Sequence, residues 1–248
     1  MIIQTGNHTD IPAFYSEWFA NRLKEGYVLV RNPFNPQSVT RYALNPLVVD
    51  LLVFCSKNPR PLLKYMNLLE AYHQYWFVTI TPYGKELDPN VPDKSIVMET
   101  FRQLSSITGP GNICWRYDPI LIDETWTASR HIEHFREMCK ILEESTHTAV
   151  ISFIDLYEKV KRNFPEAKTV PFHTQLVLTE AFVDIGKKYG MTIKPCRERL
   201  PLVRKFFFSM SPFFFTNRKI AADITIRPSM CHSESRPKLF CRIPMPTA

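Results

Sequence analysis

Short apolar runs alternate with amphipathic segments along the first 196 residues of the chain. Six of these runs are typical of β-strands, and they cover residues 1–4, 48–55, 75–81, 113–117, 149–155 and 191–196, with shorter candidates at 27–31 and 39–44. Between several of them, apolar residues recur at steps of three and four, which predicts helices beginning near residues 12, 60, 93, 127 and 173. Gly190 follows the last predicted helix and is of the type expected just beyond a helix end.

Strands and helices that alternate roughly every 30 residues predict parallel strands joined by right-handed crossovers. Both an open doubly wound sheet and a (βα) barrel have this pattern. No Gly-x-Gly-x-x-Gly motif follows the first strand, and no Gly-rich loop ends in Gly-Lys-Ser/Thr. The strongest signal for a nucleotide-binding open sheet is therefore missing. The expected fold class is α/β, with a partial (βα) TIM-like barrel over residues 1–198.

Residues 199–248 form a basic, poorly patterned tail. Residues 197–248 carry ten Lys and Arg against three Asp and Glu, whereas residues 1–196 carry 21 of each. The same segment has six Pro and no Gly, and it shows neither helical nor strand periodicity. A disordered basic tail, an irregular subdomain and a shifted reading frame would each explain it. The abrupt change of composition favours the shifted frame.

Composition and hydropathy indicate a globular protein of the cytoplasm without a membrane segment. No run reaches the roughly 20 apolar residues that a membrane helix needs, and no signal peptide is visible at the N-terminus. The six Cys are widely spaced, which is typical of reduced thiols rather than of a disulfide framework.

Polar side chains follow most of the predicted strands. Because ligands bind at the carboxyl ends of parallel strands, we expect these side chains to meet around one pocket. Five have chemistry suited to catalysis, since cations hold anionic groups and carboxylates exchange protons: Asp10, Lys57, Arg116, Asp118 and Asp155. Six more are ligand-binding candidates: Thr9, Arg31, Asn32, Asn58, Tyr83 and Glu198. The expected ligand is a small or anionic molecule.

Several of these candidates also have a structural interpretation. Asp10 is placed to cap a helix that has Pro12 in its first turn. Asn58 and Asp118 each precede a Pro and are typical turn residues, and Arg116 with Asp118 could simply form a pair on the sheet. Both interpretations stay open for each residue.

The sequence contains no convincing metal site. His131 and His134 share one predicted helix with Glu133 and are expected on its solvated face. Cys55 and Cys114 lie inside apolar runs and are expected to be packing residues.

Several motifs together resemble an uncharacterised family of bacterial proteins, a domain of unknown function. These motifs are "TDIPAFYSEWFANRLKEGYVLVRNPFNP", "FCSKNP", "TITPYG", "NICWRYDPIL", "HIEHF" and "VISFIDLY", and the resemblance ends near Glu198. It implies a barrel fold related to the radical S-adenosylmethionine (radical-SAM) enzymes. Longer relatives end in a Cys-x-x-x-Cys-x-x-Cys cluster, which implies an iron–sulfur cluster and S-adenosylmethionine as their cofactors.

The chain departs from this family pattern in two places. The cysteine cluster is missing, so no cofactor is expected in this chain, and Cys231 and Cys241 do not have the required spacing. The family's Ser-Arg-Arg before Thr-Asp-Ile-Pro is replaced by residues 6–8, Gly-Asn-His, which removes two basic side chains.

Three functions follow from these observations. The favoured one is a cytosolic barrel related to an iron–sulfur, S-adenosylmethionine-dependent enzyme that lacks its cluster. The second is a cluster-independent hydrolase or lyase that uses the loop carboxylates. The third and least favoured is a nucleic-acid-binding module that uses the basic tail.

Overall fold

A computed structural model describes residues 1–6, 9–32, 34–35 and 37–196 of the chain. Glu198 and the tail predicted for residues 199–248 lie outside these residues. Within the described part, no helix is long and apolar enough to cross a membrane.

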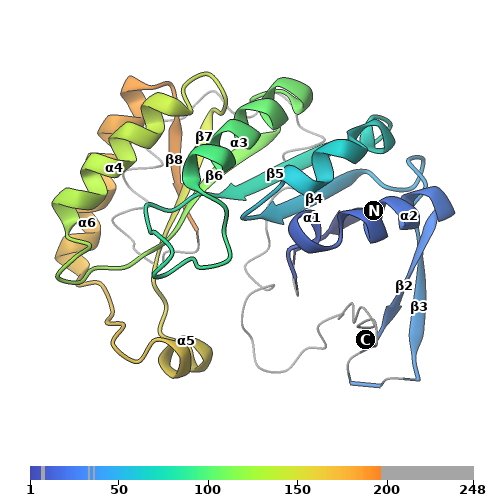
Figure 1. Ribbon diagram of the computed structural model, residues 1–248, viewed down its shortest axis with the longest axis horizontal. Helices are drawn as coiled ribbons and strands as arrows, with labels where there is room; N and C mark the ends of the chain where they lie inside the picture. The colour runs from blue at the N-terminus through green and yellow to red at the C-terminus, as the bar shows by residue number, and fades with distance from the viewer. Residues whose placement is uncertain (7–8, 33, 36, 197–248) are drawn as a thin grey trace.

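Six parallel strands form one sheet in the order β1-β4-β5-β6-β7-β8 (Figure 1). Their bounds are β1 Ile2–Gln4, β4 Leu51–Ser56, β5 Gln74–Thr79, β6 Ile113–Ile120, β7 Thr148–Phe153 and β8 Thr192–Pro195. All six match the apolar runs of the sequence. Because each strand of the sheet pairs with the next one along the chain, right-handed crossovers place the helices on one side. This is the order of a (βα) barrel and not of a doubly wound sheet, so the predicted partial barrel is confirmed.

Apart from α5, which lies away from the sheet, the helices follow one another along that side (Figure 1). They are α1 Ile11–Phe14, α2 Ser16–Glu25, the 3-10 helix η1 Arg60–Leu69, α3 Lys94–Thr108, α4 Ala128–Ile141, α5 Glu158–Asn163 and α6 Phe172–Lys188. Gly190 has a φ of +67° just after α6, as expected of the residue beyond a helix end.

Alternate strand residues face the helices and build the core. Phe54, Trp76, Trp115 and Tyr117 are fully buried there, and Phe54 stacks on Trp76 at 4.1 Å between ring centroids. The residues between them point to the other face and are mostly only partly buried along β4, β5 and β6. We call this second side of the sheet the inner face, because it corresponds to the interior of the barrel.

Strands β2 (Tyr27–Arg31) and β3 (Val39–Ala43) pair antiparallel in a separate hairpin. The hairpin projects from the end of the molecule that carries α2 (Figure 1). The sequence predicted both strands. It also predicted that Arg31 and Asn32 end a strand at the shared pocket, but β2 is not part of the six-stranded sheet.

Three helical details differ from the sequence pattern. The first predicted helix is interrupted at Tyr15, whose φ of −132° is not helical, so α1 and α2 are separate. The segment after Pro59 forms a 3-10 helix and not an α-helix. Helix α5 was not predicted, and it buries none of its residues, which explains the absence of an amphipathic pattern.

Candidate functional site

Arg116 lies at the centre of a polar group on the inner face of the sheet. Its guanidinium forms an ion pair with Asp118, two residues further along β6, and the two side chains are 23% and 20% exposed. One amino group donates a hydrogen bond of 3.2 Å to the thiol of Cys55 on β4. The other lies 4.0 Å from the thiol of Cys196, which follows β8. One side chain thus connects β6 to β4 and approaches the segment that follows β8.

The neighbours of Arg116 stabilise its charged form. Burial disfavours the charged guanidinium, but the Asp118 carboxylate and the two thiols favour it, so the pKa of Arg116 lies above its ordinary value. A permanently charged, planar group at a partly exposed position is suited to holding a carboxylate or phosphate.

Asp10 has the helix-capping role that the sequence left open. Its Oδ1 accepts a hydrogen bond of 3.0 Å from the backbone N–H of Ala13 in α1. Its Oδ2 accepts one of 2.7 Å from the backbone N–H of Lys57, just after β4. Desolvation by burial outweighs these bonds and raises the pKa of Asp10 above its ordinary value. The carboxylate therefore joins α1 to the end of β4.

Lys57 pairs with a residue that the sequence analysis missed. Its ammonium group lies 2.5 Å from Asp88, in the loop that follows β5. The second oxygen of Asp88 accepts a hydrogen bond of 2.8 Å from the hydroxyl of Thr81. A polar loop of 14 residues between β5 and α3, longer than most βα loops, was the signal for a site here.

Tyr83 and His131 form hydrogen bonds with the segment that follows Asp118. The buried Tyr83 hydroxyl donates to the carbonyl of Pro119 and accepts from the N–H of Leu121. His131 is fully buried, contacts the carbonyl of Leu121 at 2.8 Å and meets the Tyr117 hydroxyl at 2.8 Å. The solvated position expected for His131 is therefore wrong.

The remaining candidates lie apart from this polar group. The exposed Arg31 belongs to the separate hairpin, and Asn32 accepts hydrogen bonds within the hairpin turn. Asp155 is exposed after β7. Thr9 and Asn58 are half-buried beside the Asp10 cap, and the N–H of Asn58 donates to Ser56.

Two cysteine predictions have different outcomes. Cys114 is buried, as expected of a packing residue, and burial raises its pKa to about 12. Cys55 is only half-buried and contacts Arg116, so the expectation of a packing residue is wrong for it. The apolar run 48–55 concealed that alternate residues of β4 face the helices and the inner face.

Gly6 packs directly against Cys55. A Cβ atom at this position would lie 2.6 Å from the Cβ of Cys55, closer than such atoms approach in proteins. Because glycine has no Cβ, Gly6 lets the segment just after β1 approach Cys55 on the inner face closely.

A family described as "Domain of unknown function (DUF1848)" matches residues 2–208. The chain belongs to this family. The resemblance stated from the sequence motifs is thereby confirmed, and the match continues ten residues beyond the predicted end of the barrel domain. No curated protein matches this DUF1848 chain.

The DUF1848 chain is similar to two solved structures with the radical-SAM type of barrel. One is "Spore photoproduct lyase complexed with dinucleoside spore photoproduct", at 11% identity and a TM-score of 0.51. The other is a point mutant of spore photoproduct lyase, at 12% identity and a TM-score of 0.50. Each alignment covers 78% of this chain but only 60% of the lyase chain. At this identity the similarity supports the fold alone.

Proposed function

We propose that this DUF1848 chain is an enzyme-type barrel that binds a small organic anion on its inner face, with Arg116 as the anion-binding residue. The observation that carries the proposal is the partly exposed Arg116–Asp118 pair towards the carboxyl end of β6. Barrels of this type bind ligands at that end of their strands. The described cysteines form no disulfide, which suits a cytosolic location.

The residues of the described barrel do not fit an iron–sulfur cluster. Such a cluster needs three thiolates in one place, and no group of three potential metal ligands occurs within the part of the chain that the structure describes. Cys55 and Cys196 both lie against a guanidinium, and Cys114 and Cys139 are buried. We therefore assign the barrel a ligand-binding role and derive no step through a cluster.

Arg116 and Asp118 have different roles in this binding. The forked donors of Arg116 suit the two oxygens of a carboxylate or phosphate. Asp118 holds the guanidinium in place and can accept a hydrogen bond from a ligand hydroxyl or amine. One neighbour in fold is complexed with a dinucleoside, and this supports a polar organic ligand for the barrel.

The two rival functions have less support. The carboxylates of Asp10, Asp118 and Asp155 are respectively a helix cap, an arginine partner and a solvent-exposed group, so no acid–base pair emerges for a hydrolase or lyase. The nucleic-acid function depends on residues 199–248, which lie outside the described residues.

Binding of succinate, a small organic anion, measured by calorimetry with the full chain, tests the proposal. Each of its carboxylates has the two oxygens that the forked donors of Arg116 suit. We expect saturable binding that Arg116→Ala weakens at least about tenfold, through loss of a charge-assisted hydrogen bond. Absence of saturable binding, or equal binding by the Arg116→Ala variant, would overturn the proposal.

Anaerobic reconstitution with iron and sulfide tests the missing cluster separately. We expect no stable cluster on the full chain. Visible absorption that corresponds to about one cluster per chain would contradict this part of the proposal.

A further inference from the structure

A small pocket lies where β5 ends and α3 begins. Its volume is about 70 Å³, and one water needs roughly 10–15 Å³ of such space, so it has room for several waters or one small oxyanion. The loop between Thr81 and Asp93 forms much of its wall. Thr79 also lines it and is the register partner of Arg116, so the pocket borders the inner face.

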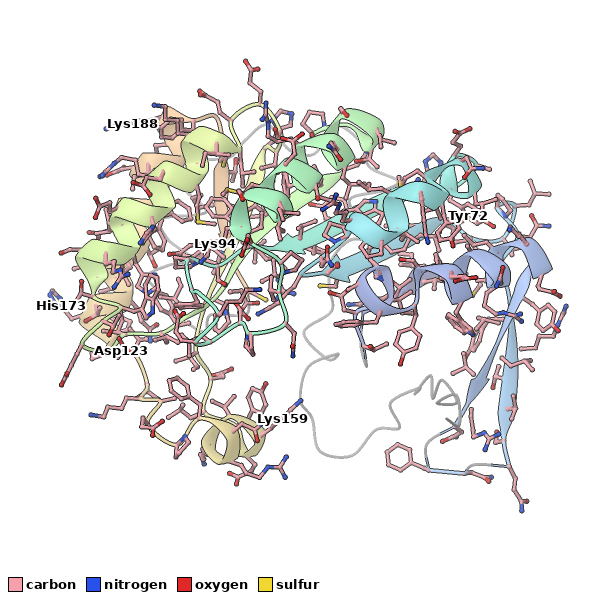
Figure 2. All side chains as sticks on the ribbon, in the orientation of Figure 1. Tyr72, Lys94, Asp123, Lys159, His173 and Lys188 are labelled. Carbon is pink, nitrogen blue, oxygen red and sulfur yellow. The ribbon has the colours of Figure 1, made fainter. Side chains whose placement is uncertain are left out.

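Three lysines line this pocket. Lys57 directly follows β4, and Lys94 is the first residue of α3 (Figure 2). The third, Lys85, donates a hydrogen bond of 2.6 Å to the carbonyl of Val91 within the loop. The carboxylate of Asp88 is already engaged on both oxygens, by Lys57 and by the hydroxyl of Thr81. It thereby fixes one ammonium group and one hydroxyl at the wall of the pocket.

Lys94 lacks such a carboxylate partner among the hydrogen bonds of the described residues. Its ammonium group donates to the backbone carbonyl of Tyr83. Partial burial disfavours its charge and lowers the pKa of Lys94 from its ordinary value, against the opposing effect of the nearby Glu86, Asp88 and Asp93 carboxylates. Asp93, at the N-cap of α3, makes no side-chain hydrogen bond to the first turn. The positive end of a 15-residue helix dipole adds to the ammonium group, and the Asp93 carboxylate, which also lines the pocket, partly offsets it.

We propose that this pocket is a phosphate-binding subsite, in which Lys57 and Lys94 hold a single phosphate group from two sides. Both ammonium groups retain donors beyond the bonds described, because an ammonium group has three N–H bonds. The hydroxyl of Thr81 donates its proton to Asp88, so the donors available to an oxyanion are those of the lysines. Three lysines and two aspartates, Asp88 and Asp93, line this small space, and its excess of one positive charge suits a compact oxyanion better than an apolar group.

Titration of the full chain with inorganic phosphate, followed by ³¹P NMR and calorimetry, tests the subsite. We expect saturable binding that Lys94→Gln and Lys57→Gln each weaken at least about tenfold, since each removes a charge-assisted hydrogen bond. Lys188→Gln is the matched control, because this exposed lysine lies at the end of α6, away from Lys94 (Figure 2). It should bind phosphate as the unmodified chain does.

Lys94→Arg keeps the positive charge and should retain phosphate binding. Thermal melting of every variant shows whether a loss of binding comes instead from a folding defect. Absence of saturable binding, or equal affinity of the Lys57→Gln and Lys94→Gln variants and the control, would overturn the subsite. Glycerol phosphate is the second probe, and tighter binding than inorganic phosphate would assign the site to a phosphate ester rather than the free ion. Arg116→Ala removes any phosphate that Arg116 itself holds, but the binding that Lys57→Gln and Lys94→Gln weaken should remain in it, so the subsite and the proposed function can fail independently.

Discussion

The guanidinium of Arg116 on β6 donates a hydrogen bond of 3.2 Å to the thiol of Cys55 on β4, across the intervening strand β5. Strands two positions apart in a flat sheet are separated by about 9.5 Å. The long arginine side chain therefore lies across the inner face rather than pointing away from it. On its other side it approaches Cys196 after β8, so Arg116 organises the polar part of the inner face.

Replacing Arg116 by Ala should lower the free energy of unfolding by about 1–3 kcal/mol, because Asp118 would remain partly buried without its partner. Arg116→Lys should restore only part of this, since an ammonium group lacks the forked geometry. Urea denaturation measures both effects. Arg102→Ala is the control, because its pair with Glu99 is exposed and should contribute within about 0.5 kcal/mol. Equal stabilities for the Arg116 and Arg102 variants would contradict the prediction.

Three of the described thiols should differ in reactivity. Cys55 is half-buried, whereas Cys114 and Cys139 are buried and burial raises the pKa of each to about 12. Because the thiolate is the reactive form, iodoacetamide at pH 8 should modify Cys55 well before Cys114 and Cys139. Peptide mass spectrometry over a time course distinguishes the sites. All of them should react in denaturant, and early native labelling of Cys114 would refute the assignment.

The sheet could be predicted from the sequence because its strands are apolar runs at regular spacing. Phe54 and Trp115, for example, face the helices, and their neighbours along the strand are also largely apolar. The barrel was favoured over a doubly wound sheet because no Gly-rich nucleotide-binding motif follows the first strand. The hairpin formed by residues 27–31 and 39–43 could not be separated from the sheet in this way, since a short strand carries no information about its partner.

The site was less predictable, because its side chains act over distances that the sequence does not specify. Arg116 and Asp118 stand two apart and lie on one strand face, which alternation alone predicts. The pairing of Lys57 with Asp88 depends on how a long loop folds back over β5. The burial of His131 depends on Tyr117 and Leu121, neither of which marks a polar environment in the sequence.

Asp10 should make a pH-dependent contribution to stability. The pKa of Asp10 is raised in the folded chain, so the folded state favours the protonated carboxyl group. The stabilisation that this preference gives is lost as pH rises from the ordinary value of 3.8 through the folded pKa. Asp10→Asn keeps a capping oxygen but cannot titrate. Relative to this variant, the unmodified chain should lose stability between about pH 4 and the folded pKa. Urea denaturation at several pH values measures the difference.

Asp10→Ala is the matched variant for the capping role itself. It should cost about 1–2 kcal/mol at neutral pH, because the N–H of Ala13 loses its acceptor. The N–H of Lys57 loses its acceptor as well. An Ala variant as stable as the Asn variant would show that the cap contributes nothing.

His131 should make stability fall in mildly acidic conditions. The Leu121 carbonyl can only accept, so Nε2 carries the proton, and Nδ1 accepts a hydrogen bond from the Tyr117 hydroxyl. Burial lowers the pKa of this neutral imidazole from its ordinary value of 6.5. The folded state's preference for the neutral imidazole therefore contributes fully to the free energy of unfolding above pH 6.5. This contribution is lost as pH falls from 6.5 through the folded pKa of His131.

His131→Gln removes this titration and should cost about 2–4 kcal/mol at pH 7.5, because the buried Tyr117 hydroxyl and Leu121 carbonyl lose their partner. The stability difference from the unmodified chain should shrink as pH falls below 6.5, since only the latter must keep a buried imidazole neutral. His134→Gln is the control, because His134 is one third exposed and its only ion-pair partner is the exposed Glu137 within the part of the chain described. Urea denaturation curves between pH 5 and 7.5 measure this stability difference. If the difference between His131→Gln and the unmodified chain stayed constant over this range, the pKa of His131 would not change on unfolding.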